Sequence, residues 1–215
     1  MKTVFLSFLC LGLVNVGDCN PNAIHGSGNI KTEARNVGPF TKINLSGSPD
    51  ITVTIGPELS VAVTTDDNIL PVINTTVEGA TLNVYSKQSY SASQEVKVKI
   101  TMPALDGVSV SGSGDIQVTG LKAGELEARV TGSGDVTLKG SAERLRAEVT
   151  GSGDVHAGDL SAKNARVNVT GSGDVTVRAT AELEATVTGS GDVNYYGNPP
   201  QVNKHVTGSG DINGH

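Results

Sequence analysis

The residues with the greatest scope for chemistry in this sequence are aspartates that recur at nearly constant spacing, each directly after a Gly-Ser-Gly triplet. If the repeats are stacked, these carboxylates form a column that a cation such as calcium could bridge. Calcium takes about six to eight oxygen ligands, and the glycine- and aspartate-rich nonapeptide that binds it in toxin-type β-rolls is absent. We therefore predict no metal site. We interpret the aspartates as acceptors for backbone N–H groups of their own turns: Asp115, Asp135, Asp154, Asp174, Asp192 and Asp211.

No group of side chains has the spacing of an active site. The histidines lie near the chain ends or in different repeat positions, so we expect surface residues and not general bases: His25, His156, His205 and His215. Paired carboxylates cleave glycosidic bonds in many enzymes. The pairs here adjoin arginines or lie in connecting segments, which is typical of a solvated face: Glu125 with Glu127, and Glu182 with Glu184. We predict no catalytic residue, no cofactor and no metal ligand.

The triplets mark an internal repeat, because their first glycines recur at nearly constant intervals: Gly112, Gly132, Gly151, Gly171, Gly189 and Gly208. An interval of about 19 residues is typical of stacked supersecondary units. Within each repeat, apolar and polar residues alternate, which indicates strands with one buried face. The inward columns are Val110, Val130, Val149, Val169, Val187 and Val206 before the turn, and Ile116, Val136, Val155, Val175, Val193 and Ile212 after it.

Only a coil keeps identical residues of such repeats in register from rung to rung. The sequence therefore predicts an all-β, single-domain parallel β-helix (β-solenoid) with rungs of about 19 residues, and the bias of parallel crossovers favours a right-handed one. Glycine is expected at the corner because it reaches positive φ and lets stacked backbones approach. An outward hydroxyl column resembles the threonine arrays of ice-binding solenoids, but each member is followed at once by glycine, so a broad strip is not expected: residues 111, 131, 150, 170, 188 and 207.

Residues 1–19 have the pattern of a secretory signal peptide, with a lysine followed by an apolar run. Cys10 and Cys19 lie in or next to this leader, so no disulfide is expected in the exported part, and Cys19 could instead carry a lipid. We expect an extended lead-in over residues 20–38 and a helical turn over 66–73, with Asp66 or Asp67 as its cap. The net charge of −6 argues against nucleic acid and against an anionic membrane surface.

The order of motifs resembles the “putative auto-transporter adhesin, head GIN domain” family of bacterial envelope proteins. The resemblance is carried by “RNVGPFTKINLSGSPDITVTIG”, “VTTDDNILPVINTTVEGATLNVYS”, the TGSGD rungs and “YYGNPPQVNKHVTGSGDI”. No linker-like stretch divides residues 39–215, so we expect one domain with irregular rungs over 39–107 and regular TGSGD rungs over 108–215, which the resemblance identifies as a head GIN domain. The family implies a right-handed β-helix of exported proteins and no functional residues that can be transferred.

Two functions from different classes follow from these observations. The first is a noncatalytic, exported cell-envelope protein, in the periplasm or on the cell surface, that binds a glycan or an envelope protein through an extended face. It has no transmembrane span once the leader is removed. The alternative is a carbohydrate-active β-helix enzyme. A groove lined by carboxylates and aromatic residues would favour the enzyme, and a face covered by Ser, Thr and Asn would favour binding.

Overall fold

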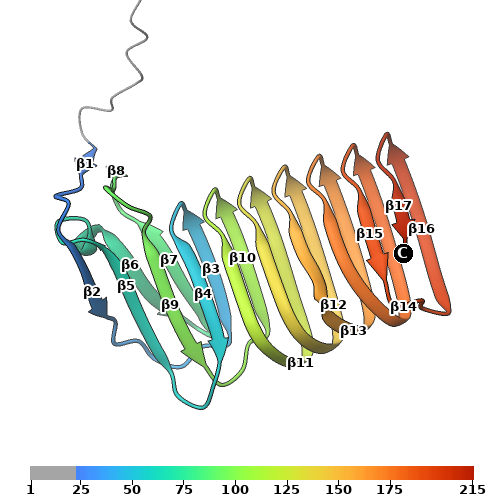
Figure 1. Cartoon of the computed structure of the whole chain (residues 1–215), viewed down its shortest axis with the longest axis horizontal. Helices are drawn as coiled ribbons and strands as arrows, with labels where there is room; N and C mark the ends of the chain where they lie inside the picture. The colour runs from blue at the N-terminus through green and yellow to red at the C-terminus, as the bar shows by residue number, and fades with distance from the viewer. Residues whose placement is uncertain (1–22) are drawn as a thin grey trace, which may run out of the picture.

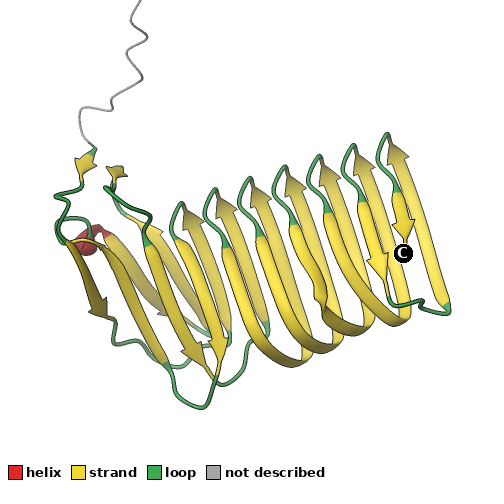
Figure 2. Ribbon diagram, viewed as in Figure 1, coloured by secondary structure: helices red, strands yellow, loops and turns green. Residues whose placement is uncertain are grey.

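The computed structural model describes residues 23–215, so the expected leader and both cysteines lie outside the described residues. The described chain is a stack of parallel coils built almost wholly from strands (Figures 1 and 2), which confirms the predicted β-solenoid. Strands of the regular half are β10 (Gly107–Gly112), β11 (Ile116–Gly132), β12 (Val136–Gly151), β13 (Val155–Gly171), β14 (Val175–Gly189), β15 (Val193–Tyr196), β16 (Gln201–Gly208) and β17 (Ile212–Gly214). Nowhere in residues 23–215 is there a helix with the length and apolar character that bilayer crossing requires.

Equivalent residues of successive rungs lie side by side, as the columns predicted. Val130 pairs with Val149, and Val149 pairs with Val169, in parallel strands. The alternating inward residues form one continuous core, in which Val149 and Val169 are each only 1% exposed. The last rung departs from this pattern: Val206, predicted to be buried, is 41% exposed because no described rung lies on its outer side. Ile212 is partly buried for the same reason.

The Gly-Ser-Gly triplets turn the corner between rungs, as predicted. Gly132 and Gly151 have φ angles of 135° and 129°, values that side chains other than glycine rarely adopt. The N–H groups of Ser152 and Gly153 both donate to the carbonyl oxygen of Gly132, at 2.9 and 3.1 Å. The same bifurcated contact recurs at each regular turn, so the corner is a backbone structure that links neighbouring rungs.

Each regular rung is one long, bent strand. β11 to β14 contain 15 to 17 residues each. The ladder shifts register once or twice between neighbouring strands, beginning after Val118, Thr137 and Ala157. Such bulges bend a strand and increase its local twist. The coil therefore turns sharply at the glycine corner and bends at a second, bulged corner opposite to it.

The N-terminal half begins the stack and covers its end. β3 (Lys42–Gly47) pairs in parallel with β10, and β4 (Asp50–Ile55) pairs in parallel with β11 and with β9 (Lys97–Met102). β7 (Thr81–Ser86) extends the stack, and β6 (Ile73–Glu78) pairs with it antiparallel. β5 (Ser60–Asp66) likewise runs antiparallel to β9. These antiparallel strands cover the core where the parallel ladder begins.

Residues 23–38, part of the expected lead-in, contribute two strands to this end. β1 (Ile24–His25) pairs with β8 (Tyr90–Ser91), and β2 (Ile30–Ala34) pairs antiparallel with β5. The expected helical turn is a short 3-10 helix, η1 (Leu70–Val72), with Pro71 in its first turn. The expected cap is wrong, because neither Asp66 nor Asp67 bonds to this helix through its side chain.

Asp66 and Asp67 instead hold residues 27–31 against the body of the protein. The buried Asp66 carboxylate accepts hydrogen bonds from the N–H of Gly28 at 2.7 Å and from the N–H and hydroxyl of Ser93 at 2.9 and 2.6 Å. Asp67 accepts from the Ser27 hydroxyl at 2.7 Å and lies 3.2 Å from the Lys31 ammonium. These polar contacts, which we call the Asp66–Asp67 clamp, attach residues 27–31 to the rest of the described chain.

The clamp predicts an acid-sensitive contribution to stability. The Ser93 hydroxyl is the main cause that lowers the pKa of Asp66, and hydrogen bonds led by that of Ser27 lower the pKa of Asp67 to about 2. The unfolded value is about 3.9, so the stabilisation is present above this pH and is lost as the pH falls towards 2. We expect the urea midpoint to fall between pH 4.5 and pH 2, and to fall less in Asp67→Asn. Equal pH dependence in the two proteins would contradict the role of Asp67.

Candidate functional site

The repeated aspartates form a ladder between rungs, which corrects the prediction that each serves its own turn. The Oδ1 atom of Asp135 accepts the backbone N–H of Asp154 at 2.8 Å, and that of Asp154 accepts the N–H of Asp174 at 2.7 Å. The same contact links Asp50 to Asp115 and continues to Asp211. Each carboxylate thus bonds to the next rung, because stacking in register places the next N–H directly beside it.

The histidines predicted to be surface residues lie in separate places. His156 is exposed beside Asp135 and Asp154, with candidate ligand atoms of the three residues within 4.8 Å of one another. Since Asp135 already accepts the N–H of Asp154, this group is part of the aspartate ladder. His205 lies 3.4 Å from the hydroxyl of Thr207. His215 stacks on Tyr196 at 5.1 Å, and the exposed His25 uses its carbonyl oxygen to accept from an asparagine.

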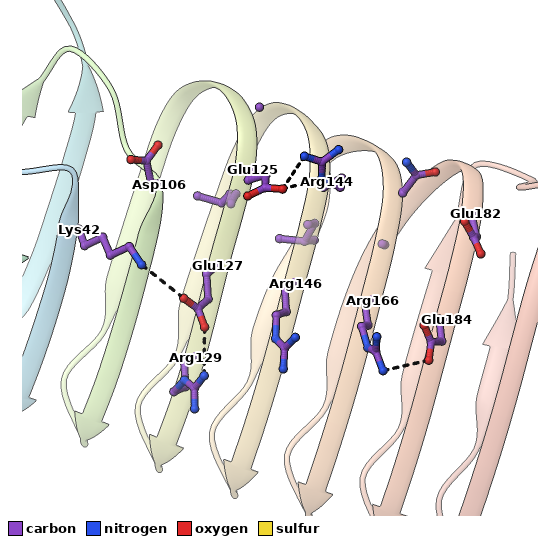
Figure 3. A pocket seen from close by; sticks show the side chains of 15 residues that line it. Lys42, Asp106, Glu125, Glu127, Arg129, Arg144, Arg146, Arg166, Glu182 and Glu184 are labelled. Carbon is purple, nitrogen blue, oxygen red and sulfur yellow. Dashed lines mark hydrogen bonds and ion pairs between the residues drawn. The ribbon is translucent and has the colours of Figure 1, made fainter. Parts of the chain in front are cut away.

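A groove crosses the outward face of β11, β12, β13 and β14 beside the bulged corner. Its volume is about 1010 Å³, and buried residues of the bent strands form part of its floor. Its walls carry charged side chains from each rung (Figure 3). We define the charged groove by its polar residues: Lys42, Asp106, Glu125, Glu127, Arg129, Arg144, Arg146, Asn164, Arg166, Glu182 and Glu184. None of the residues that line it is aromatic.

The charges follow the rungs in a definite order. At two equivalent positions of each rung, β11 carries two acids, β12 carries two arginines, β13 carries an asparagine and an arginine, and β14 carries two acids, while Arg129 lies further along β11. Strand register aligns these residues in two columns. One column is Glu125, Arg144, Asn164 and Glu182, and the other is Glu127, Arg146, Arg166 and Glu184. The two acidic pairs of the sequence analysis are therefore the two ends of one groove, separated by arginines.

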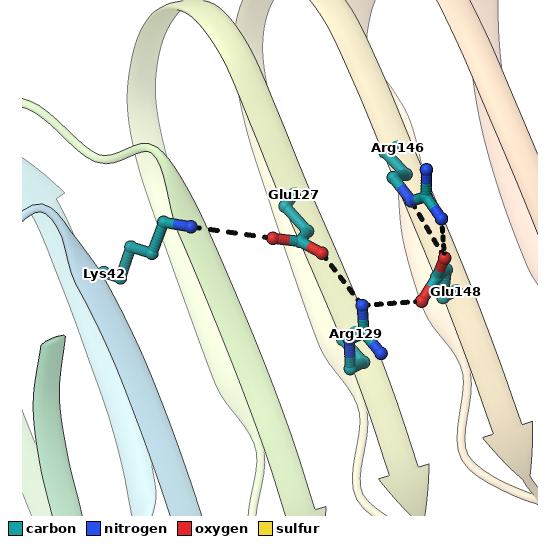
Figure 4. Close-up of polar contacts among 5 residues, drawn as sticks. All are labelled: Lys42, Glu127, Arg129, Arg146 and Glu148. Atoms are coloured by element: carbon teal, nitrogen blue, oxygen red, sulfur yellow. Dashed lines mark hydrogen bonds and ion pairs between the residues drawn. The ribbon is translucent and has the colours of Figure 1, made fainter.

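Ion pairs within and between rungs form a row in and beside the groove (Figure 4). Arg129 donates to Glu127 at 3.0 Å and lies 2.8 Å from Glu148, which also accepts from Arg146. Lys42 completes the row, 3.7 Å from Glu127. The hydrogen bond from Arg129 is the main cause that lowers the pKa of Glu127, and the same bond raises the pKa of Arg129.

The groove cannot be predicted from the sequence pattern alone, although both acidic pairs are visible in it. The arginines beside these pairs indicate only a solvated face when the sequence is read alone. The structure gives Arg129 two acidic partners, so a charge reversal there would place three acids together. The sequence does contain one signal for the groove. Arg146 and Arg166 occupy the same position in consecutive repeats, so the strand register places them side by side with no acid between them. The outward hydroxyl column is exposed, as predicted: Ser111, Thr131, Thr150, Thr170, Thr188 and Thr207.

Comparison with known proteins gives a consistent result. A family model described as “Putative auto-transporter adhesin, head GIN domain” matches residues 39–199. A solved structure described as a putative adhesin from Bacteroides fragilis has 27% identity and a TM-score of 0.75, over 90% of this chain and 100% of its own. No curated protein sequence shows significant similarity to the chain.

Two further solved structures share the fold. A protein described as a putative lipid binding protein from Parabacteroides distasonis has 25% identity and a TM-score of 0.61, over 90% of this chain and 100% of its own. A protein described as a putative adhesin from Parabacteroides merdae has 21% identity and a TM-score of 0.57, over 90% of this chain and 99% of its own. The latter similarity concerns the fold alone.

Proposed function

Since the chain belongs to the head GIN domain family of putative auto-transporter adhesins, we propose that it is a noncatalytic, exported envelope protein that binds its partner along the charged groove. The observation that carries this proposal is the groove itself, which is open, elongated and crossed by four equivalent rungs. Solenoids commonly present such extended surfaces to their ligands. Export to the periplasm or cell surface follows from the leader expected over residues 1–19, and the proposed partner is a glycan or an envelope protein.

The enzymatic alternative has less support from the chemistry of the groove. A glycosidase needs one carboxylic acid that stays protonated to donate to the leaving group. Arginines contact three of the groove carboxylates, those of Glu125, Glu127 and Glu184, and the pKa of Glu127 is lowered. With its pKa lowered in this way, the carboxylate of Glu127 is a poor proton donor. The groove also lacks the aromatic residues that the enzymatic interpretation expects.

Obstruction of the groove tests this proposal. A Cβ atom added to Gly124, which lines the groove, meets nothing within 4 Å, and its φ is not positive. Gly124→Trp should therefore fill the groove without unfolding the protein. We expect its binding in a glycan array and on bacterial cells to fall by at least about tenfold.

Gly38→Trp is the matched control, because its Cβ also meets open space and it lies outside the groove. Equal binding by the two variants would contradict a role for the groove. Incubation of the wild type with the same polysaccharides tests the alternative: new reducing ends that disappear in Glu127→Gln would favour an enzyme.

A further inference from the structure

We propose that the centre of the charged groove binds a single carboxylate of a linear, sparsely charged acidic glycan. We call Arg144, Arg146 and Arg166 the arginine centre. This inference rests on the proposed function and adds the chemical class of the ligand. It is carried by the order of charges along the rungs and by the arginine donors that remain unused.

The order of charges matches a ligand with one anionic group between neutral units. Arg146 and Arg166 are register partners on neighbouring strands, and Arg144 lies beside Asn164 in the adjacent column. Neighbouring strands are about 4.8 Å apart, so three arginines extend from closely spaced positions on two adjacent strands. An acidic pair flanks the arginines on each side, one on β11 and one on β14. Three strand spacings separate β11 from β14, which is roughly 14 Å.

Arginine donors remain available although each guanidinium has an acidic neighbour. Arg144 donates through Nε and Nη2 to one oxygen of Glu125, and Arg146 donates through the same two atoms to one oxygen of Glu148. Arg166 approaches Glu184 through Nη2 alone, at 3.2 Å. Among the described residues, no contact occupies Nη1 of any of the three, nor Nε of Arg166. A guanidinium can donate five hydrogen bonds in fixed directions, so the centre retains donors suited to a carboxylate.

Fold stability explains only part of this arrangement, because Arg146 belongs to a network with Glu148 and Arg129, whereas Arg144 and Arg166 form isolated surface pairs. The arginine side chains are 52% to 63% exposed, and exposed ion pairs contribute little to stability. Arg146 and Arg166 repel each other in the absence of a ligand, because like charges on adjacent strands are unfavourable. A bound carboxylate between them would replace this repulsion with charge-assisted hydrogen bonds.

The flanking acids restrict the choice of ligand. Their carboxylates can accept hydrogen bonds from sugar hydroxyl groups, and they repel further anions. A densely charged polymer would place anions against Glu125, Glu127, Glu182 and Glu184, whereas a glycan with spaced uronates would place hydroxyls there. The ligand that fits is therefore an acidic glycan in which neutral sugars separate the carboxylates.

Calorimetric titration of the purified protein with three hexasaccharides tests this inference. The probes are hyaluronan, in which uronate alternates with a neutral sugar, neutral chitohexaose, and heparin. We expect hyaluronan to bind more tightly than both others. In Arg146→Gln/Arg166→Gln we expect hyaluronan binding to weaken by about tenfold or more, since charge-assisted hydrogen bonds are lost.

Lys139→Gln/Lys163→Gln is the matched control, because it removes two charges from β12 and β13 outside the groove. It should change the affinity by less than about twofold. Glu182→Gln/Glu184→Gln should raise the affinity for heparin, because it removes the acids at one end. A native circular-dichroism spectrum and melting curve must accompany each variant.

The outcomes separate this inference from the proposed function. Loss of hyaluronan binding in the arginine variant alone supports it. Equal hyaluronan binding by the arginine variant and the wild type overturns it, as do tighter binding of heparin, equal binding of chitohexaose, and arginine-dependent binding of phosphatidylglycerol vesicles. If Gly124→Trp still blocks binding to another partner, the proposed function stands and only the acidic-glycan assignment fails.

Discussion

Val169→Asp is expected to unfold the C-terminal rungs of the protein. Val169 is 1% exposed and lies in the ladder between Val149 and Val187. An unpaired carboxylate at this position costs several kcal/mol, out of a total free energy of unfolding of about 5–15 kcal/mol for a typical domain. Thermal denaturation followed by circular dichroism should show a large loss of stability, and hydrogen exchange should locate the loss in β13, β14 and β16.

Thr170→Asp is the matched control, one residue further along the same strand. Thr170 is exposed, and its register partners Thr150 and Thr188 are uncharged. A surface change of this kind should alter the free energy of unfolding by about 0.5 kcal/mol or less. If the two variants lost the same stability, the inward and outward assignment of β13 would be wrong.

Gly151→Ala is expected to destabilise the protein by roughly 2–4 kcal/mol, through strain at a positive φ and overlap with the rung beneath. The φ angle is 129°, and an added Cβ would lie 2.5 Å from the carbonyl oxygen of Gly132. That oxygen accepts hydrogen bonds from the N–H groups of Ser152 and Gly153, which directly follow Gly151, so the two rungs cannot move apart at this point without breaking these bonds.

Gly124→Ala is the control, because Gly124 lies in the bent strand β11 at a position where a Cβ atom fits. Its Cβ would meet nothing within 4 Å and its φ is not positive, so the substitution should be neutral or stabilise by up to about 1 kcal/mol. Urea unfolding of both variants measures the difference. A smaller loss for Gly151→Ala than for Gly124→Ala would refute the account of the corner.

The repeated half of the fold could be predicted because the strand alternation and the longer repeat both indicate the same stacked strands. Alternation with period two assigns the faces, and the longer repeat, which recurs at each Gly-Ser-Gly triplet, places equivalent positions in register. The inward columns around Val149 and the positive φ at Gly151 followed directly. The antiparallel pairing of β2, β5 and β6 did not follow, although the alternation over residues 59–65 does predict the strand β5, because pairing at the end of the stack depends on which surface needs covering and not on a repeated pattern.

The candidate site was less predictable because it depends on neighbours in adjacent rungs. The sequence showed that each aspartate could accept a backbone N–H, but Asp135 bonds to the rung of Asp154 and not to its own turn. The pairing of Glu127 with Arg129 could be read from nearby residues. Arg146 and Arg166 belong to different rungs, so their adjacency becomes visible only when the strand register is known.

The two corners of the coil also differ in how they tolerate changes in chain length. At the glycine corner, paired N–H groups and the aspartate ladder fix every rung to its neighbour. At the bulged corner, the register shifts already absorb the small differences in length between one repeat and the next. Insertions and deletions can therefore accumulate beside the charged groove while the stack is preserved. The same scaffold can thus diversify its recognition surface, and rung duplication would lengthen that surface one strand at a time.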